Sequence, residues 1–210
     1  MSDPSLFAIH SYVEVDPSRG WGPLQAELER RGFPCRIVVS PRGETTTPHQ
    51  DRARIMVEAL KDVPGEVTLA GISNEGLYMP LVAAARPVRR IVMINAVIPF
   101  PGRSFREGSK GQEVFGSVTA DLAAQRAPGM SERCPLTELP KVEWVYLYGE
   151  HDEAVRPQWE RWAAREYLHV DPIMVAGAGH AEILQHVGEV IDAAAFGLRA
   201  PNVREGTATC

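Results

Sequence analysis

Short apolar runs alternate with stretches of helical apolar spacing along most of this 210-residue chain. Each run is short and is bounded by turn-forming residues, which is typical of buried strands. We predict six strands, at Leu6–His10, Cys35–Ser40, Val67–Ala70, Arg90–Asn95, Val142–Tyr148 and Pro172–Ala176. Strands that alternate with helices favour a mostly parallel sheet with helices on both faces, so the predicted fold class is α/β.

The segments between the runs carry apolar residues at the i, i+3, i+4, i+7 spacing of an amphipathic helix. The spacing is clearest in two sets: Ala53, Met56, Val57 and Leu60, and Leu184, Val187, Val190 or Ile191, and Ala194. We interpret these stripes as core faces and not as sites. Gly32 suits the left-handed position after a helix over Trp21–Arg31, and Pro157 suits the first turn of a later helix.

One segment, from about residue 99 to 140, breaks the alternation. It is rich in Gly, Pro and charged residues, and a short helix is predicted only around Val114–Gln125. A connection of that length inside a compact domain is usually functional, so we expect a short lid insertion. The tail over residues 197–210 is small and polar and is expected to be disordered. Residues 1–196 are then predicted to form a single domain.

Composition and charge exclude several classes of function. The chain is 44% apolar with a formal net charge of −5, and its basic residues form no stripe that would follow a phosphate backbone. Nucleic acid is therefore not an expected partner. No apolar run approaches a membrane span, and the first residues do not resemble a leader peptide. We expect a cytoplasmic protein that is monomeric or homodimeric. Its expected partner is a small-molecule substrate and not a membrane.

Neither the cysteines nor the histidines suggest a metal or a cofactor. Cys35, Cys134 and Cys210 are odd in number and lack CxxC spacing, so three free thiols are expected. Four histidines are isolated and are interpreted as surface or helix residues: His49, His151, His169 and His186. Because the chain also lacks a P-loop and a GxGxxG turn, no cofactor is predicted.

Polar residues follow several of the predicted strands at the edge where a parallel sheet binds its ligands. Ser73 lies in the turn Gly71–Gly76 (GISNEG) after the third strand. Asp152 follows the fifth strand and His180 follows the sixth. Serine, acid and histidine in this chain order are typical of an α/β-hydrolase triad.

Each of the three residues meets a chemical requirement of nucleophilic catalysis. Serine is a weak nucleophile and needs a base, which His180 can supply, and Asp152 would orient the imidazole. The backbone N–H groups of Asn74 and Tyr12 are the candidates for an oxyanion hole. Alternatives stay open for each residue: Ser73 as a helix cap, His180 as a structural histidine, and Glu150 or Glu153 as the orienting acid.

These residues resemble the α/β-hydrolase superfamily, in particular its compact, short-lid branch of plant methylesterases, hydroxynitrile lyases and bacterial esterases. The resemblance is carried by three segments: FAIHSYVEVDPSRGWGPLQAELERRGFPCRIVVSP, LVAAARPVRRIVMINAVIPFPGRSF, and YGEHDEAVRPQWERWAAREYLHVDPIMVAGAGHAEIL. It implies that Ser73, Asp152 and His180 stand at the nucleophile, acid and base positions.

The sequence departs from the pattern of that branch at three places. Ser11 follows His10 where a glycine is usual, and Arg42 lies near the usual position of an aspartate. Glu75 occupies the elbow position at which a second small residue is usual. Its carboxylate either interacts with the exposed N–H groups of the following helix or points into the pocket, and the sequence does not choose between these orientations.

The leading hypothesis is a serine hydrolase that cleaves a small carboxylic ester or lactone through an acyl-enzyme on Ser73. Five residues flank the predicted site as pocket candidates: Ser11, Glu75, Tyr78, Ile98 and Phe100. A lyase or natural-product cyclase that uses Ser73 and His180 for proton transfer is the alternative, because fold does not fix function. A catalytically silent ligand-binding relative is the third hypothesis.

Overall fold

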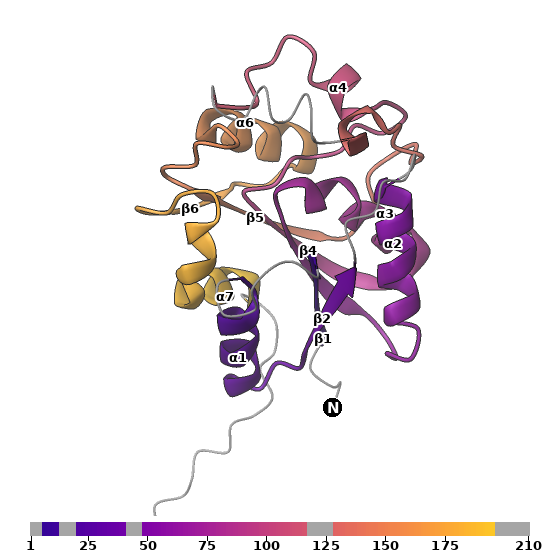
Figure 1. Cartoon of the computed structure of the whole chain (residues 1–210), viewed down its shortest axis with the longest axis vertical. Helices are drawn as coiled ribbons and strands as arrows, with labels where there is room; N and C mark the ends of the chain where they lie inside the picture. The colour runs from indigo at the N-terminus through magenta and orange to yellow at the C-terminus, as the bar shows by residue number, and fades with distance from the viewer. Residues whose placement is uncertain (1–5, 13–19, 41–47, 117–127, 196–210) are drawn as a thin grey trace, which may run out of the picture.

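Six parallel strands form one sheet in the order β2-β1-β3-β4-β5-β6 (Figure 1). The computed structural model describes residues 6–12, 20–40, 48–116 and 128–195. The strands are β1 (Leu6–Tyr12), β2 (Cys35–Ser40), β3 (Val67–Ile72), β4 (Val88–Ile94), β5 (Glu143–Gly149) and β6 (Ile173–Val175). The predicted fold class is confirmed, and every pairing in the sheet is parallel.

Helices cover both faces of the sheet and enclose a separate apolar core on each. On one face, α1 (Gly22–Arg30) and α7 (Val187–Ala195) lie side by side (Figure 1). The other face is covered by α2 (Pro48–Ala59), α3 (Met79–Ala85) and α6 (Pro157–Leu168). Both faces of the central strands are buried, which explains why these strands read as continuous apolar runs and do not alternate.

The predicted helix ends agree with the structure in two places and differ in one. Gly32 follows α1 with a φ of 83°, and α6 begins at Pro157. The stripe from Leu184 to Ala194, predicted as one helix, is divided between a short 3₁₀ helix, η3 (Glu182–Gln185), and α7. The chain turns at His186, whose backbone N–H bonds to the Ile183 carbonyl oxygen.

The bounds predicted for β2 agree with the structure, and those of the other strands are wrong at one or both ends by one or two residues, because pairing with a neighbour decides where a strand ends. β1 continues through Tyr12, which pairs in register with Ser40, although the sequence prediction ended this strand at His10. Likewise β3 continues to Ile72, which pairs with Ile94. Polar residues at strand ends are therefore still part of the sheet.

The predicted lid region holds two short helical segments, α4 (Phe105–Gly108) and η2 (Pro128–Ser131). Ser104 and Glu107 form a capping box at the start of α4, in which the Glu107 carboxylate accepts from Ser104 N at 2.8 Å. Most of the predicted helix Val114–Gln125 and the tail over residues 197–210 lie outside the described residues. In the described ranges, no helix has the length and apolar character that crossing a membrane requires.

Candidate active site

Ser73 sits at a sharp turn between β3 and the 3₁₀ helix η1 (Ser73–Leu77). Its φ is 59°, a conformation that side chains other than glycine rarely adopt. Strain of this kind at a strand-to-helix turn is the signature of a nucleophile elbow, which exposes a serine above the sheet. The Ser73 carbonyl oxygen accepts a hydrogen bond from Val97 N at 3.1 Å, which links the turn to the segment that follows β4.

The elbow needs glycine at two positions, and neither of them is position 75. A Cβ at Gly76 would lie 2.1 Å from the Val97 carbonyl oxygen, and one at Gly71 would lie 2.9 Å from Cβ of Glu75. The close backbone approach therefore falls on Gly76, whereas at Gly71 the crowding comes from the side chains of Glu75 and Met79. Position 75 has room for a larger side chain.

The Glu75 carboxylate turns back toward the strands. Its Oε2 atom accepts from Ile72 N at 2.8 Å, and its Oε1 atom lies 3.1 Å from Nδ1 of His10. Burial raises the pKa of this carboxyl, and hydrogen bonds from His10, Ile72 and Tyr78 partly oppose the shift. Of the two orientations that the sequence left open, the structure has the one in which the carboxylate binds backbone at the helix start.

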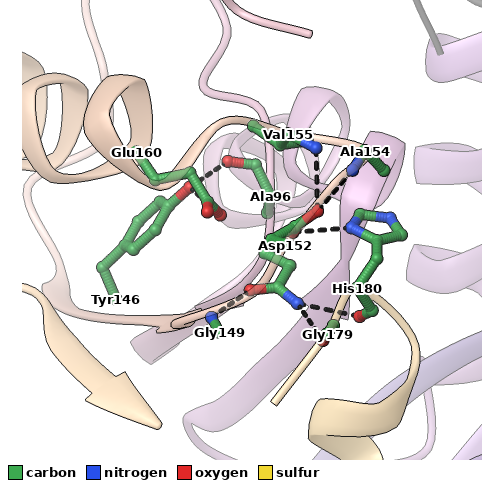
Figure 2. A network of polar contacts seen from close by, with 10 residues as sticks. Ala96, Tyr146, Gly149, Asp152, Ala154, Val155, Glu160, Gly179 and His180 are labelled. Carbon is green, nitrogen blue, oxygen red and sulfur yellow. Dashed lines mark hydrogen bonds and ion pairs between the residues drawn. The ribbon is translucent and has the colours of Figure 1, made fainter. Parts of the chain in front are cut away.

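Asp152 and His180 form a hydrogen-bonded pair between the turns after β5 and β6 (Figure 2). Asp152 Oδ2 lies 2.7 Å from His180 Nδ1, while Oδ1 accepts from the N–H groups of Ala154 and Val155 at 2.7 and 2.9 Å. The Asp152 side chain is fully buried and the His180 side chain is 26% exposed. The backbone N–H groups therefore fix one oxygen of the carboxylate, and the other oxygen faces the imidazole.

The neighbouring acids do not contact His180 in the described part of the chain. Glu150 Oε2 instead accepts from Gly177 N at 2.9 Å, in the turn after β6, and the Glu153 side chain is exposed. Of the three candidate acids, the geometry favours Asp152. Nε2 of His180, the ring nitrogen that would face a substrate, has no hydrogen-bond partner among the described residues.

Ser73 follows β3 and His180 lies in the turn after β6, so both lie at the same edge of the sheet. Within the described ranges, however, no hydrogen bond joins Ser73 Oγ to the imidazole. Catalytic hydrogen bonds are often long or misaligned in a ligand-free enzyme and tighten when substrate binds. The structure therefore brings the acid and the base together and places the serine at a strained elbow at the same end of the sheet.

Asn95 is a site residue that the sequence analysis missed. It follows β4, is fully buried and has a φ of 45°. Its amide nitrogen donates to the carbonyl oxygens of Gly179 and His180 at 3.1 and 2.8 Å, and its Oδ1 accepts from Gly149 N at 2.7 Å. One side chain thus fixes the turn that carries Asp152 relative to the turn that carries His180. Its place at a strand's carboxyl end was the only signal in the sequence.

Tyr146 and Glu160, a buried pair that the sequence analysis also missed, lie on the side of Asp152 that is away from His180 (Figure 2). The Tyr146 hydroxyl donates to the Ala96 carbonyl oxygen and lies 3.3 Å from Glu160 Oε1. Burial, together with the nearby charge of Asp152, raises the pKa of Glu160 well above its usual range. The Tyr146 hydroxyl has a single hydrogen, which it donates to the Ala96 carbonyl oxygen. A neutral Glu160 is therefore the donor in its contact with the Tyr146 hydroxyl oxygen.

The two candidates for the oxyanion hole, Asn74 and Tyr12, belong to different elements. Asn74 is the second residue of η1, so its N–H lies at the start of a helical turn. Tyr12 is the last residue of β1 and is paired with Ser40, so it belongs to the strand and not to a loop after it. The segment that follows, residues 13–19, lies outside the described residues.

A hollow that is partly open to solvent lies among η1, α2, α3 and the lid region. Its lining contains apolar side chains, among them Leu77, Leu81, Phe100 and Phe105, and the buried His49, whose pKa burial lowers. Of the five predicted pocket residues, Phe100 lines this hollow. Tyr78, Ile98 and Glu75 are buried in the core, and Ser11 is half-buried in β1.

No cluster of three or more His, Cys, Asp or Glu side chains suited to a metal occurs in the described ranges. Cys35 and Cys134 are free thiols, and burial raises the pKa of Cys35 to about 12. A thiol so strongly disfavoured as a thiolate is a poor nucleophile near neutral pH. Among the described residues, Ser73 therefore remains the candidate nucleophile, with His180 and Asp152 as the candidate base and acid.

The sequence matches no protein-family model and no curated protein. The structure, in contrast, is similar to solved esterases and hydrolases. Polyneuridine aldehyde esterase is 14% identical, with a TM-score of 0.61 over 91% of this chain and 98% of that one. A pyrethroid hydrolase from Sphingobium faniae JZ-2 is 15% identical, with a TM-score of 0.61 over 91% and 97%.

An extracellular α/β-hydrolase from a Paenibacillus species is similar to the same extent. It is 17% identical to this chain, with a TM-score of 0.58 over 90% of this chain and 99% of that one. Identities this low show shared architecture and leave the substrate open. With its parallel sheet, strand order and strained serine turn, the chain has the α/β-hydrolase fold.

Proposed function

We propose that this protein is a serine hydrolase that cleaves a small carboxylic ester through an acyl-enzyme on Ser73. The observation that carries the proposal is the buried Asp152 bonded at 2.7 Å to His180, at the edge of the sheet where Ser73 is held at a φ of 59°. The esterases and hydrolases among the similar structures support the same reaction class.

In this reaction Ser73 Oγ attacks the carbonyl carbon of the ester while His180 Nε2 takes the hydroxyl proton. The tetrahedral oxyanion is stabilised by the N–H groups proposed at Asn74 and Tyr12. His180 then gives its proton to the departing alcohol, and water hydrolyses the acyl-serine by the same steps in reverse. Asp152 keeps Nδ1 protonated throughout, so that Nε2 is the basic nitrogen.

The surroundings support a substrate with a modest apolar group. Leu77, which lines the hollow, ends the same 3₁₀ helix that Ser73 begins, and Phe100 and Phe105 line the hollow from the lid region. The lining also includes His49 and three charged residues, Arg103, Glu132 and Arg133, so that an apolar group and a polar group of one small molecule could both find contacts there. The orientation of Glu75 also supports hydrolysis, because its carboxylate is buried and is directed to Ile72 N and His10.

Labelling with a fluorophosphonate tests the proposed nucleophile. We expect one probe per chain, mapped by mass spectrometry to the peptide that carries Ser73, because the probe reacts with serines that a histidine activates. Ser73→Ala should remain unlabelled, whereas Ser109→Ala, which changes a serine in the lid region, should label like the wild type. A folded protein left unlabelled at saturating probe would contradict the proposal and favour proton-transfer chemistry.

A further inference from the structure

Four buried side chains beneath the serine turn form a hydrogen-bonded group that the proposed reaction does not use. They are His10 on β1, Ser40 on β2, Glu75 on η1, and Tyr78 between η1 and α3. None of them is more than 4% exposed. We call this set the elbow network. Its members come from three parts of the chain and meet at the carboxyl edge of the sheet.

His10 is the centre of the elbow network, because both of its ring nitrogens have partners. Nδ1 lies 3.1 Å from Glu75 Oε1 and 2.7 Å from the Tyr78 hydroxyl, and Nε2 lies 2.6 Å from Ser40 Oγ. The Tyr78 ring also packs edge-on against the imidazole, with 5.3 Å between the ring centroids. The partners at both nitrogens and the packed Tyr78 ring together fix the orientation of the His10 imidazole.

The elbow network joins the two chain segments that would form the oxyanion hole. Glu75 directly follows Asn74, and its Oε2 atom also holds Ile72 N, one residue before Ser73. His10 lies two residues before Tyr12 on β1. The contact between Glu75 and His10 therefore links the start of η1 to the end of β1 beyond Ile9 and Ala70, the last residues at which β1 and β3 pair. In acyl transfer, the position of these two N–H groups decides how well the oxyanion is stabilised.

The network also accounts for a large residue at the elbow. A buried carboxylate is costly unless hydrogen bonds satisfy it, and Glu75 has three sources of such bonds in His10, Ile72 and Tyr78. A glycine at position 75 would leave the Ile72 N–H without the carboxylate oxygen and His10 Nδ1 without one of its neighbours. The chain thus carries at this position a side chain that links strand and helix.

We propose that Glu75 and His10 are positioning residues, which hold the two halves of the oxyanion hole at their working separation. This inference rests on the proposed hydrolase function. It predicts that disruption of the pair lowers the rate of the chemical step, with little effect on ground-state binding of the ester. A purely structural role predicts a loss of thermal stability alone.

The test compares wild type with Glu75→Ala, Glu75→Gln and His10→Ala on p-nitrophenyl butyrate. Glu75→Ala is expected to lower kcat by about 10- to 100-fold, because misplacement on the order of an ångström has that effect. KM should change by less than about threefold, and affinity for a trifluoromethyl ketone that forms a tetrahedral adduct should fall in parallel with kcat. Glu75→Gln keeps an oxygen for Ile72 N and should recover most of the rate.

The double variant Glu75→Ala/His10→Ala should be no slower than the slower single variant, because the two residues act as one unit. Glu107→Ala is the matched control. It removes a similar capping carboxylate from α4, away from the serine turn, and should lower the thermal midpoint while leaving kcat and ketone affinity unchanged.

Two results would be adverse, and they are distinguishable. If Glu75→Ala and His10→Ala lower the thermal midpoint as Glu107→Ala does, but keep kcat and ketone affinity within about threefold of wild type, the positioning role is wrong while the hydrolase proposal stands. If the wild type itself neither turns over the ester nor reacts with a fluorophosphonate at Ser73, the hydrolase proposal fails, and the positioning role fails with it.

Discussion

Asp152→Asn is expected to lower kcat for a short p-nitrophenyl ester by about 10⁴-fold while leaving the fold intact. The asparagine can keep its oxygen on the N–H groups of Ala154 and Val155, so the turn should be preserved. The amide NH₂ then faces Nδ1 of His180 in place of Oδ2. Because NH₂ is a donor, Nδ1 becomes the acceptor and the proton moves to Nε2. The imidazole in that tautomer cannot take the proton of Ser73.

The measurement is the steady-state rate between about pH 6 and pH 9, with circular dichroism to show that each variant is folded. Glu150→Gln and Glu153→Gln are the matched controls, since each removes a carboxylate beside Asp152 that does not contact His180. Both should stay within about threefold of wild type. Should Glu150→Gln or Glu153→Gln lose as much activity as Asp152→Asn, the assignment of the orienting acid would be overturned.

Glu160→Gln is expected to make the protein more stable than wild type at mildly alkaline pH. Burial and the charge of Asp152 raise the pKa of Glu160 in the folded chain. Between the ordinary pKa of glutamate and this raised value, the folded state binds more protons than the unfolded state. The contribution of Glu160 to stability is therefore present at low pH and is lost as pH rises, by about 1.4 kcal/mol per pH unit in this window.

Urea denaturation at a series of pH values from about 5 to 9 measures this effect as the difference in unfolding free energy between variant and wild type. The glutamine amide can donate to the Tyr146 hydroxyl as the neutral acid does, so activity should be retained. Glu166→Gln changes an exposed glutamate on the same helix and should leave the pH dependence as it is in wild type. A constant difference between Glu160→Gln and wild type across the range would show that Glu160 does not titrate as described.

The apolar pattern along the chain predicted the parallel sheet well. Strands that are buried on both faces appear as short apolar runs, which can be recognised without knowing which strands pair. The sequence also indicated Ser73, Asp152 and His180, since polar residues at the carboxyl ends of parallel strands gather at one edge. Whether these three act as a catalytic triad stays a prediction until it is tested by experiment.

Contacts between distant segments could not be read from the sequence. Asn95 bonds to residues 84 and 85 positions away, and Glu75 to a histidine 65 positions away. Such pairs depend on which strands become neighbours and on how side chains fill the remaining space. The orientation of Glu75 is an example, because its bond to Ile72 N lies within the local GISNEG turn, whereas its contact with His10 depends on a buried partner on β1.

Capture of the intermediate would show directly whether Ser73 forms an acyl-enzyme. The wild-type protein is mixed with p-nitrophenyl butyrate, quenched in acid within the first turnover, digested and examined by mass spectrometry. We expect a burst of p-nitrophenol and a butyryl group on the peptide that contains Ser73. Undiminished turnover by Ser73→Ala, with no acylated peptide in wild type, would contradict the proposed acyl-enzyme.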